Sequence, residues 1–266
     1  MGYIESIILG LVQGITEFLP VSSSGHLVLA QRVMGINATG DASFEVVVHV
    51  GTLLSILVVL RQPIMDLTRA TSGLLTPSRW SDLYRINPSF KTLLFVGLGT
   101  LPILIVGLTA KSQIESLFGS PNRVAGLLLV TACLLSSTLF VKQRSPAVML
   151  TGWMALVIGC AQACAILPGI SRSGTTITVA LLLGLSRHRA GEFSFLLAVP
   201  AITGAAILNL GAALDGSIGP GPLLVGLLTA FLSGTLALKL LLSMVCAGRL
   251  WWFAPYLAVV GFGWLL

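Results

Sequence analysis

Apolar runs separated by short polar segments make up most of the chain. A predominantly apolar stretch of about 20 residues can cross a bilayer as a helix, because a helix satisfies its backbone hydrogen bonds internally. We therefore predict six transmembrane helices, at residues 44–60, about 92–110, about 123–141, about 193–210, about 222–246 and about 251–266. The polar segment between the first two, residues 61–91, is expected to be a loop.

Two further apolar regions are interrupted by polar residues and proline. Residues 3–34 are broken at Pro20 and the serines that follow it, and residues 150–186 are broken around Pro168. Each arm has about 15 residues, which is too short to span a core that needs about 20. We predict that each region is a re-entrant helical hairpin.

The two broken regions resemble each other when the numbering is shifted by 149. Gln13 then falls on Gln162, and Ser23 falls on Arg172. We predict an inverted-topology repeat, with repeat one at about 1–141 and repeat two at about 150–266. The expected fold is a single all-α polytopic membrane domain over residues 1–266, with six transmembrane helices and two re-entrant hairpins whose tips meet at one site.

Composition supports the membrane interpretation. Hydrophobic residues make up 55% of the chain and charged residues 9%, with a mean hydropathy of +0.98, whereas soluble domains have about a quarter charged residues. The net charge of +6 comes from basic residues between apolar segments, so we expect it to set topology and expect no nucleic-acid partner.

The distribution of basic residues predicts an orientation. If both hairpins return to the side from which they enter, ten basic residues lie on one side and three on the other. The ten are Arg61, Arg69, Arg79, Arg85, Lys91, Lys142, Arg144, Arg187, Arg189 and Arg249, and the three are Arg32, Lys111 and Arg123. The first side is then cytoplasmic, both termini face outward, and the two hairpins enter from opposite sides.

The start of the second arm in each hairpin is rich in small polar residues. These are Ser22, Ser24 and Gly25 in the first hairpin and Ser171, Ser173, Gly174 and Thr175 in the second. Backbone N–H groups and hydroxyls converge at such helix starts and can bind an anion such as phosphate. Arg172 lies between two of these serines, and its planar guanidinium can make two hydrogen bonds to a phosphate. Alternatively, Arg172 is a buried partner of Glu17 or of helix carbonyls.

Glu17 is an acidic residue where a phosphate site would repel an uncompensated carboxylate. A divalent cation would explain it, because Mg²⁺ or Ca²⁺ takes oxygen ligands and bridges carboxylates to substrate phosphates. Gln13 lies four residues earlier on the same helical face and offers an amide oxygen. We predict Glu17 and Gln13 as metal ligands, and the alternative is that both make structural hydrogen bonds between helices.

Ser23 and His26 suggest nucleophilic chemistry. A nucleophilic hydroxyl needs a base within hydrogen-bond reach, and the imidazole of His26 lies three residues away. His49 is predicted mid-span without acidic or hydroxyl company and is interpreted as a packing residue. Glu45 is either a cap for its helix or a supporting partner of the site, and His188, among arginines, is interpreted as solvated.

Three stretches resemble one known family, the integral-membrane undecaprenyl-diphosphate phosphatases, also called bacitracin-resistance proteins. Residues Gly14–His26 and Pro168–Gly174 look like the two signatures of the family, and Glu192–Pro200 is similar to a further stretch. The resemblance covers nearly the whole chain. It implies hydrolysis of undecaprenyl diphosphate to undecaprenyl phosphate and phosphate, which recycles the lipid carrier for cell-wall synthesis, confers bacitracin resistance and requires Mg²⁺ or Ca²⁺.

Residue roles follow from the same resemblance. Glu17 becomes the metal ligand, Ser23 and His26 the nucleophile and base candidates, and Arg172 the phosphate clamp. The supporting hydroxyls would be Ser22, Ser24, Ser171 and Ser173. Gln13 departs from the family, because many members have Glu there, and an amide can bind a metal but cannot act as a base at neutral pH.

We therefore predict a phosphatase of the bacterial cytoplasmic (inner) membrane, with its active site open to the outer, periplasmic face. Its expected partners are a polyprenyl diphosphate substrate and membrane lipids, and its oligomeric state is open, with a dimer as one option. The alternative function is a transporter or flippase for a polyprenyl phosphate or anion at the same midplane site. A phosphoserine intermediate and direct attack by water both remain open at this stage.

Overall fold

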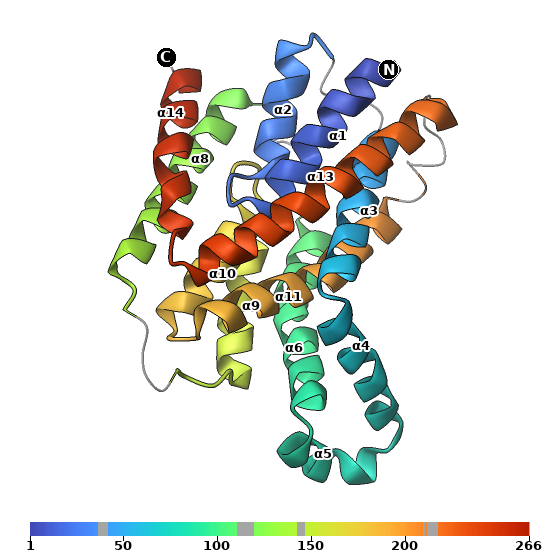
Figure 1. Ribbon diagram of the computed structural model, residues 1–266, viewed down its shortest axis with the longest axis vertical. Coiled ribbons are helices and arrows are strands. Elements are labelled where there is room, and N and C mark those ends of the chain that lie inside the picture. Colours follow the sequence, from blue (N-terminus) through green and yellow to red (C-terminus); the bar gives the residue numbers. More distant parts are fainter. Residues whose placement is uncertain (37–41, 111–119, 143–146, 210, 212–217, 266) are drawn as a thin grey trace.

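The computed structural model describes residues 1–36, 42–110, 120–142, 147–209, 211 and 218–265, and all regular elements within these ranges are helical (Figure 1). Four segments are long and apolar enough to cross a membrane. They are α6 (Pro88–Thr109), α8 (Pro121–Ser136) with the 3₁₀ turn η3 (Ser137–Phe140), α11 (Arg187–Leu208) and α13 (Pro220–Cys246). The prediction of an all-α polytopic membrane protein is confirmed.

The other two predicted spans form shorter helices. The first is α3 (Ala42–Val59), which counts as a fifth candidate span only together with the segment after it, to which it is bent by 86°. The last is α14 (Phe253–Leu265), which follows the 3₁₀ turn η4 (Leu250–Trp252). A helix of 13 residues is about 20 Å long, so α14 reaches through only part of a bilayer core.

The loop predicted for residues 61–91 is wrong, because most of this segment is helical. It contains α4 (Arg61–Ala70), the 3₁₀ turns η1 (Thr71–Leu75) and η2 (Pro77–Arg79), and α5 (Trp80–Ile86). Ile64 and Leu67 pack against the main hydrophobic core, so the segment folds back as an amphipathic extension rather than an irregular loop. Asn87 then starts α6 by accepting hydrogen bonds from the backbone N–H groups of Ser89 and Phe90.

Both interrupted regions form helical hairpins. The first consists of α1 (Tyr3–Phe18) and α2 (Ser23–Val33), and the second of α9 (Gly152–Cys164) and α10 (Arg172–Leu182). The bounds of α2 and α10 differ by 149 at both ends. Figure 1 shows α1 descending from the end that carries the N-terminus and α9 rising from the opposite end, so the breaks meet inside the bundle. The wider repeat bounds of about 1–141 and 150–266 stay a prediction.

The first arm of each hairpin packs against a long helix from the other half of the chain. Helix α1 lies along α13, and α9 lies along α6. Both contacts use glycine: a Cβ added at Gly10 would lie 2.8 Å from the carbonyl oxygen of Gly226, and one at Gly159 would collide with the backbone of Gly99. Small residues let membrane helices approach closely, and this places the hairpin breaks deep between the two halves.

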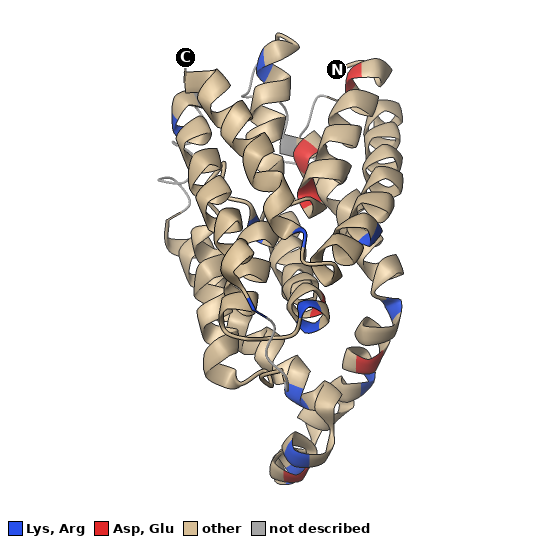
Figure 2. Cartoon of the chain, turned by 60° about the vertical axis from the view of Figure 1, so that its left-hand side comes forward, with Lys and Arg blue, Asp and Glu red and all other residues tan. Residues whose placement is uncertain are grey.

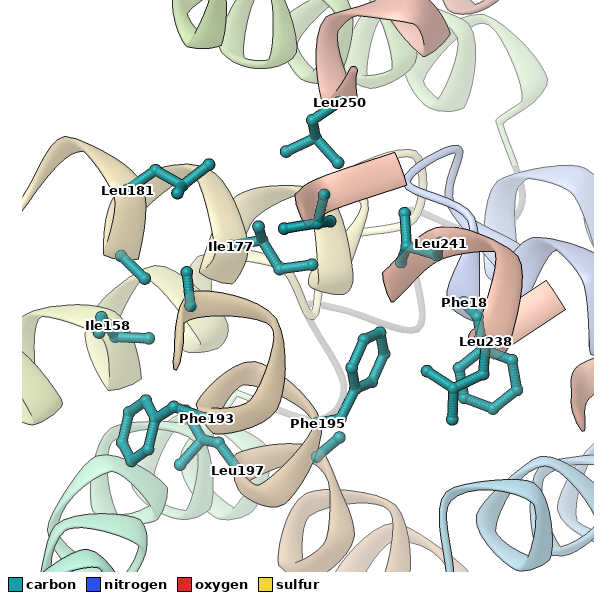
Figure 3. Packing of buried hydrophobic residues seen from close by; sticks show 14 of the residues in the cluster. Phe18, Ile158, Ile177, Leu181, Phe193, Phe195, Leu197, Leu238, Leu241 and Leu250 are labelled. Carbon is teal, nitrogen blue, oxygen red and sulfur yellow. The ribbon is translucent and has the colours of Figure 1, made fainter. Parts of the chain in front are cut away.

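The hydrophobic core surrounds the breaks. Phe18, at the end of α1, meets Phe195 of α11 edge to face with ring centroids 5.7 Å apart. Ile177 of α10 and Leu238 of α13 belong to the same buried cluster (Figure 3). Residues from both halves therefore fix the position at which α1 ends.

Charge is distributed along the long axis of the molecule. The two termini lie at the same end (Figure 1), and Lys and Arg gather toward the other end (Figure 2). This arrangement agrees with the uneven charge that the sequence shows, although Lys111 and Arg144 lie outside the described residues.

Candidate active site at the hairpin breaks

The two hairpin breaks touch each other. The hydroxyl of Ser22 accepts a hydrogen bond from the backbone N–H of Gly25, at 3.3 Å, and thus caps α2. The same hydroxyl accepts from the backbone N–H of Gly169 in the second break, at 3.1 Å. Ser171 caps α10 in the matching way, accepting from Gly174 N–H at 3.1 Å. The N-termini of α2 and α10 are therefore fixed beside one another.

Backbone conformation at the first break is unusual. Ser22 has a φ of 72°, and is the only described residue other than glycine with a positive φ. A non-glycine residue held in such a conformation costs on the order of 1–3 kcal/mol and persists only where its surroundings determine it. Ser22 is 3% exposed and bonded through both its hydroxyl and its carbonyl, which explains how the conformation is maintained.

Glu17, the last acidic residue of α1, is the centre of the site. Its Oε1 accepts a hydrogen bond from Nη2 of Arg172 at 2.6 Å, which is also an ion pair. Its Oε2 accepts from Ser23 Oγ at 2.6 Å and from Gln13 Nε2 at 3.0 Å. The residue is 8% exposed. The structure thus brings Gln13, Glu17, Ser23 and Arg172 together.

Arg172 is only partly satisfied. Its side chain is 13% exposed, and its guanidinium lies over the ring of Phe195 at 5.9 Å from the centroid. Nη2 pairs with Glu17, but the buried Nη1 has no hydrogen-bond partner among the described residues. An unpaired buried donor is costly, and it is the expected state of a group that awaits an acceptor such as a phosphate oxygen.

The remaining predicted residues line the same two breaks. Ser24 Oγ lies 3.4 Å from Ser22 Oγ, and Ser173 Oγ lies 3.3 Å from Ser171 Oγ. The buried hydroxyl of Thr175 has no partner among the described residues.

Two glycines allow the breaks to approach. A Cβ at Gly174 would lie 3.1 Å from Pro20 Cβ, and one at Gly25 would lie 3.3 Å from Ser22 Oγ. Thr131 of α8 holds the second break in place, because its hydroxyl donates to Gly169 O at 2.9 Å and accepts from Ser171 N–H at 3.1 Å.

His26 is close in sequence to Ser23 but makes other contacts. Its Nδ1 lies 2.9 Å from the carbonyl oxygen of Ser22, and its Nε2 lies 2.8 Å from the hydroxyl of Tyr256 on α14. Both ring nitrogens are therefore engaged, while the hydroxyl of Ser23 is turned to Glu17. In this geometry Glu17, not His26, is placed to accept the proton of Ser23.

His49 also belongs to the site, although the sequence did not indicate it. The prediction that no acidic residue lies near His49 is wrong. Its Nε2 lies 3.8 Å from Oε2 of Glu17, and its Nδ1 is 2.7 Å from the carbonyl oxygen of Glu45. A carbonyl only accepts, so Nδ1 carries the proton and Nε2 faces the carboxylate. Because α3 crosses α1 only in the folded bundle, the local sequence carries no signal for this contact.

Two other interpretations concern residues at the periphery. His188 is exposed, as its solvated interpretation predicts, and it also lies 3.4 Å from Glu192. Glu45 is partly buried, and its backbone carbonyl rather than its side chain makes the contact to His49.

A divalent cation is compatible with the oxygen atoms of the first break. Oε1 of Gln13 is buried without a partner among the described residues, and the same amide donates to Glu17 through its nitrogen. The amide faces Glu17 with its nitrogen, so the amide oxygen and the carboxylate would share one cation only with the amide turned over. Both are ligands that Mg²⁺ or Ca²⁺ accepts. The described residues contain no group of three or more His, Cys, Asp or Glu that could hold a metal by itself. A cation here would have to take further ligands from water or from a phosphate.

The fold and the site together define a class: a polytopic membrane protein in which two helix breaks from opposite ends build one buried, anion-compatible site. The chain belongs to the family described as bacitracin resistance protein BacA, whose family model matches residues 6–263.

Curated relatives cover nearly the whole chain. An undecaprenyl-diphosphatase from Bacteroides fragilis is 41% identical over 267 residues, which is 98% of this chain and 96% of the relative. The undecaprenyl-diphosphatase of Korarchaeum cryptofilum is 42% identical over 261 residues, covering 97% and 96%. That of Salinibacter ruber is 38% identical over 265 residues, covering 98% and 97%.

Proposed function

We propose that this protein hydrolyses undecaprenyl diphosphate to undecaprenyl phosphate and phosphate at the two hairpin breaks. The observation that carries the proposal is the state of Arg172: one guanidinium nitrogen is held by Glu17, and the other is buried without an acceptor. A phosphate oxygen would satisfy that nitrogen. Membership of the family and the names of the relatives support the same substrate.

Ser23 is the proposed nucleophile and Glu17 its base. Ser23 Oγ already donates to Glu17 Oε2 at 2.6 Å, so the proton can pass to the carboxylate as the oxygen attacks the terminal phosphorus. The bond from that phosphorus to the bridging oxygen breaks, and undecaprenyl phosphate leaves. Water then attacks the phosphorus of the phosphoserine, and the bond from that phosphorus to Ser23 Oγ breaks. Glu17 returns its proton to Oγ, one proton of the water stays on the released phosphate, and the other passes to solvent.

Charge stabilisation would come from the two helix starts and Arg172. The first N–H groups of α2 and α10 have no intrahelical acceptor, and the dipole at each N-terminus favours negative charge. Because both termini and the guanidinium are fixed before substrate binds, they need little reorganisation as charge develops.

We further propose that Gln13 and Glu17 are the residues that would hold Mg²⁺ or Ca²⁺. When bound, the cation would neutralise part of the charge on the diphosphate. Without the cation, the amide nitrogen of Gln13 orients the carboxylate of Glu17 by a 3.0 Å hydrogen bond.

The orientation is proposed on charge. The protein lies in the bacterial inner membrane with both termini outside and the basic end in the cytoplasm. The resemblance to the family, rather than the direction of either hairpin, is the ground on which we propose that the site opens to the outer face.

The test is phosphate release from a polyprenyl diphosphate by the purified protein in detergent. Wild type, Glu17→Ala and Arg172→Ala are compared with EDTA and with added Mg²⁺ or Ca²⁺. Metal-dependent release by wild type, lost in both variants while the fold persists, would support one composite phosphatase site. A well-folded wild type that releases no phosphate with either metal would overturn the proposal and favour transport, since hydrolysis needs no second compartment.

A further inference from the structure

A line of contacts connects the last helix to the proposed nucleophile. The hydroxyl of Tyr256, on α14, lies 2.8 Å from Nε2 of His26, and the two rings stack with centroids 5.7 Å apart and planes 16° from parallel. His26 Nδ1 lies 2.9 Å from the carbonyl oxygen of Ser22, which also accepts the backbone N–H of His26 at 3.1 Å. The next residue along the chain is Ser23.

The direction of each hydrogen bond follows from the atoms. The carbonyl of Ser22 can only accept, so Nδ1 of His26 must donate to it. In the neutral imidazole Nε2 then has the lone pair, and the hydroxyl of Tyr256 donates to it. The carbonyl of Ser22 therefore sets the tautomer, and Tyr256 supports it by holding the ring in the orientation in which His26 donates to that carbonyl.

The bond from His26 acts where the backbone is strained. Ser22 has the positive φ of 72°, and its conformation directs the following hydroxyl, that of Ser23, to Glu17 at 2.6 Å. Gly25 and Gly169 fix the side chain of Ser22, and among the described residues only His26 adds a side-chain contact to its carbonyl. If the imidazole rotates, the carbonyl loses one of its two donors, and the turn is free to relax.

We infer that Tyr256 is a positioning residue for the hydrolysis reaction: through His26 it holds the strained turn at Ser22 that aims Ser23 at Glu17. The inference rests on the proposed function. It also gives His26 a role that its geometry permits, since both ring nitrogens are engaged away from Ser23. Neither Tyr256 nor His26 needs to touch the substrate for this role.

The experiment is steady-state phosphate release by Tyr256→Phe, which removes the hydroxyl and keeps the ring. Loss of one neutral hydrogen bond should lower kcat roughly five- to tenfold. KM should stay within about twofold of the wild-type value, because binding of the diphosphate does not depend on the orientation of the Ser23 hydroxyl. Tyr84→Phe is the matched control, and it should behave as wild type. Tyr84 is exposed to a similar degree, 41% against 47%, but it lies on α5, at the end of the molecule opposite to α14 (Figure 1).

A double-mutant cycle tests the route through the imidazole. His26→Ala should lower kcat at least as much as Tyr256→Phe, and adding Tyr256→Phe to His26→Ala should cause no further loss. Full additivity would overturn the proposal, as would an unchanged kcat or a rise in KM alone in Tyr256→Phe. Loss of the folded state in Tyr256→Phe would also overturn it, because the hydroxyl would then support the bundle rather than the turn. An inactive wild type in the same assay would instead contradict the proposed function.

Discussion

Replacing Arg172 by lysine separates its two contacts. In the structure Nη2 pairs with Glu17 at 2.6 Å, and Nη1 is buried without an acceptor. A lysine has a single charged nitrogen, so it can either pair with Glu17 or contact a phosphate, but it cannot present the two nitrogens of the arginine fork at once. Arg172→Lys should therefore remain folded and lose most of its activity.

The size of the effect follows from the contact that is lost. A hydrogen bond to a charged group contributes about 1.5–3 kcal/mol, which corresponds to roughly a 10- to 150-fold fall in kcat/KM. Stability should change much less than in Arg172→Ala, where Glu17 would be left buried without its partner at a cost of about 3–5 kcal/mol. Comparing the two variants therefore distinguishes the contact of Arg172 with the substrate phosphate from its ion pair with Glu17.

The assay combines phosphate release in detergent with thermal unfolding of each variant. The reasoning is refuted if Arg172→Lys keeps activity within about threefold of wild type, because Nη1 would then have no role in catalysis. It is also refuted if Arg172→Lys is as unstable as Arg172→Ala, because a retained positive charge would then fail to compensate Glu17.

Three further predictions concern the nucleophile, the metal and the orientation. Ser23→Ala should abolish turnover, and labelled phosphate should become trapped on Ser23 of wild type after a rapid quench; turnover by Ser23→Ala would instead favour direct attack by water. Gln13→Glu adds a second carboxylate beside Glu17 and should lower the Mg²⁺ or Ca²⁺ concentration for half-maximal activity by about tenfold or more, measured by titration after EDTA treatment; an unchanged midpoint would argue against a metal at this position. In a cysteine-free background, a membrane-impermeant maleimide added to intact spheroplasts should label Gly2→Cys and not Ser78→Cys, and the reverse pattern would invert the proposed orientation.

Local chemistry made the hairpins predictable from the sequence. Proline lacks the N–H that a helix interior needs, so both breaks fall where expected, at Pro20 and Pro168. The shift of 149 related the breaks to each other, and the resulting prediction that they meet is confirmed by the pair between Glu17 and Arg172.

The contacts of the two histidines could not be predicted in the same way. The spacing of Ser23 and His26 is that of neighbours on a helix face, yet each side chain has a closer partner in the fold, Glu17 and Tyr256 respectively. Tyr256 is 230 residues from His26, and nothing in either local pattern relates them. His49 likewise reaches Glu17 only because helices distant in sequence cross. Side-chain direction at a crossing depends on packing that periodicity does not encode.

The polar segment 61–91 was misjudged for a different reason. Its charged residues suggested solvent, but Ile64 and Leu67 recur at helical spacing and are partly buried against the core. A short amphipathic helix has too few apolar residues to be predicted as a transmembrane helix, but it has enough to pack against the hydrophobic core of the bundle.

The pair between Glu17 and Arg172 also has a consequence for biogenesis. The two residues are 155 positions apart, so while the chain is being synthesised the first hairpin is made long before its guanidinium partner exists. Until Arg172 is inserted, the carboxylate of Glu17 lies at membrane depth without a cationic partner, which is unfavourable. A nascent chain that stops in this interval would keep an unpaired carboxylate within the membrane, and a membrane protease or chaperone can recognise such a group. Premature stop codons ahead of residue 172 should therefore yield products that are cleared from the membrane, rather than stable and merely inactive fragments.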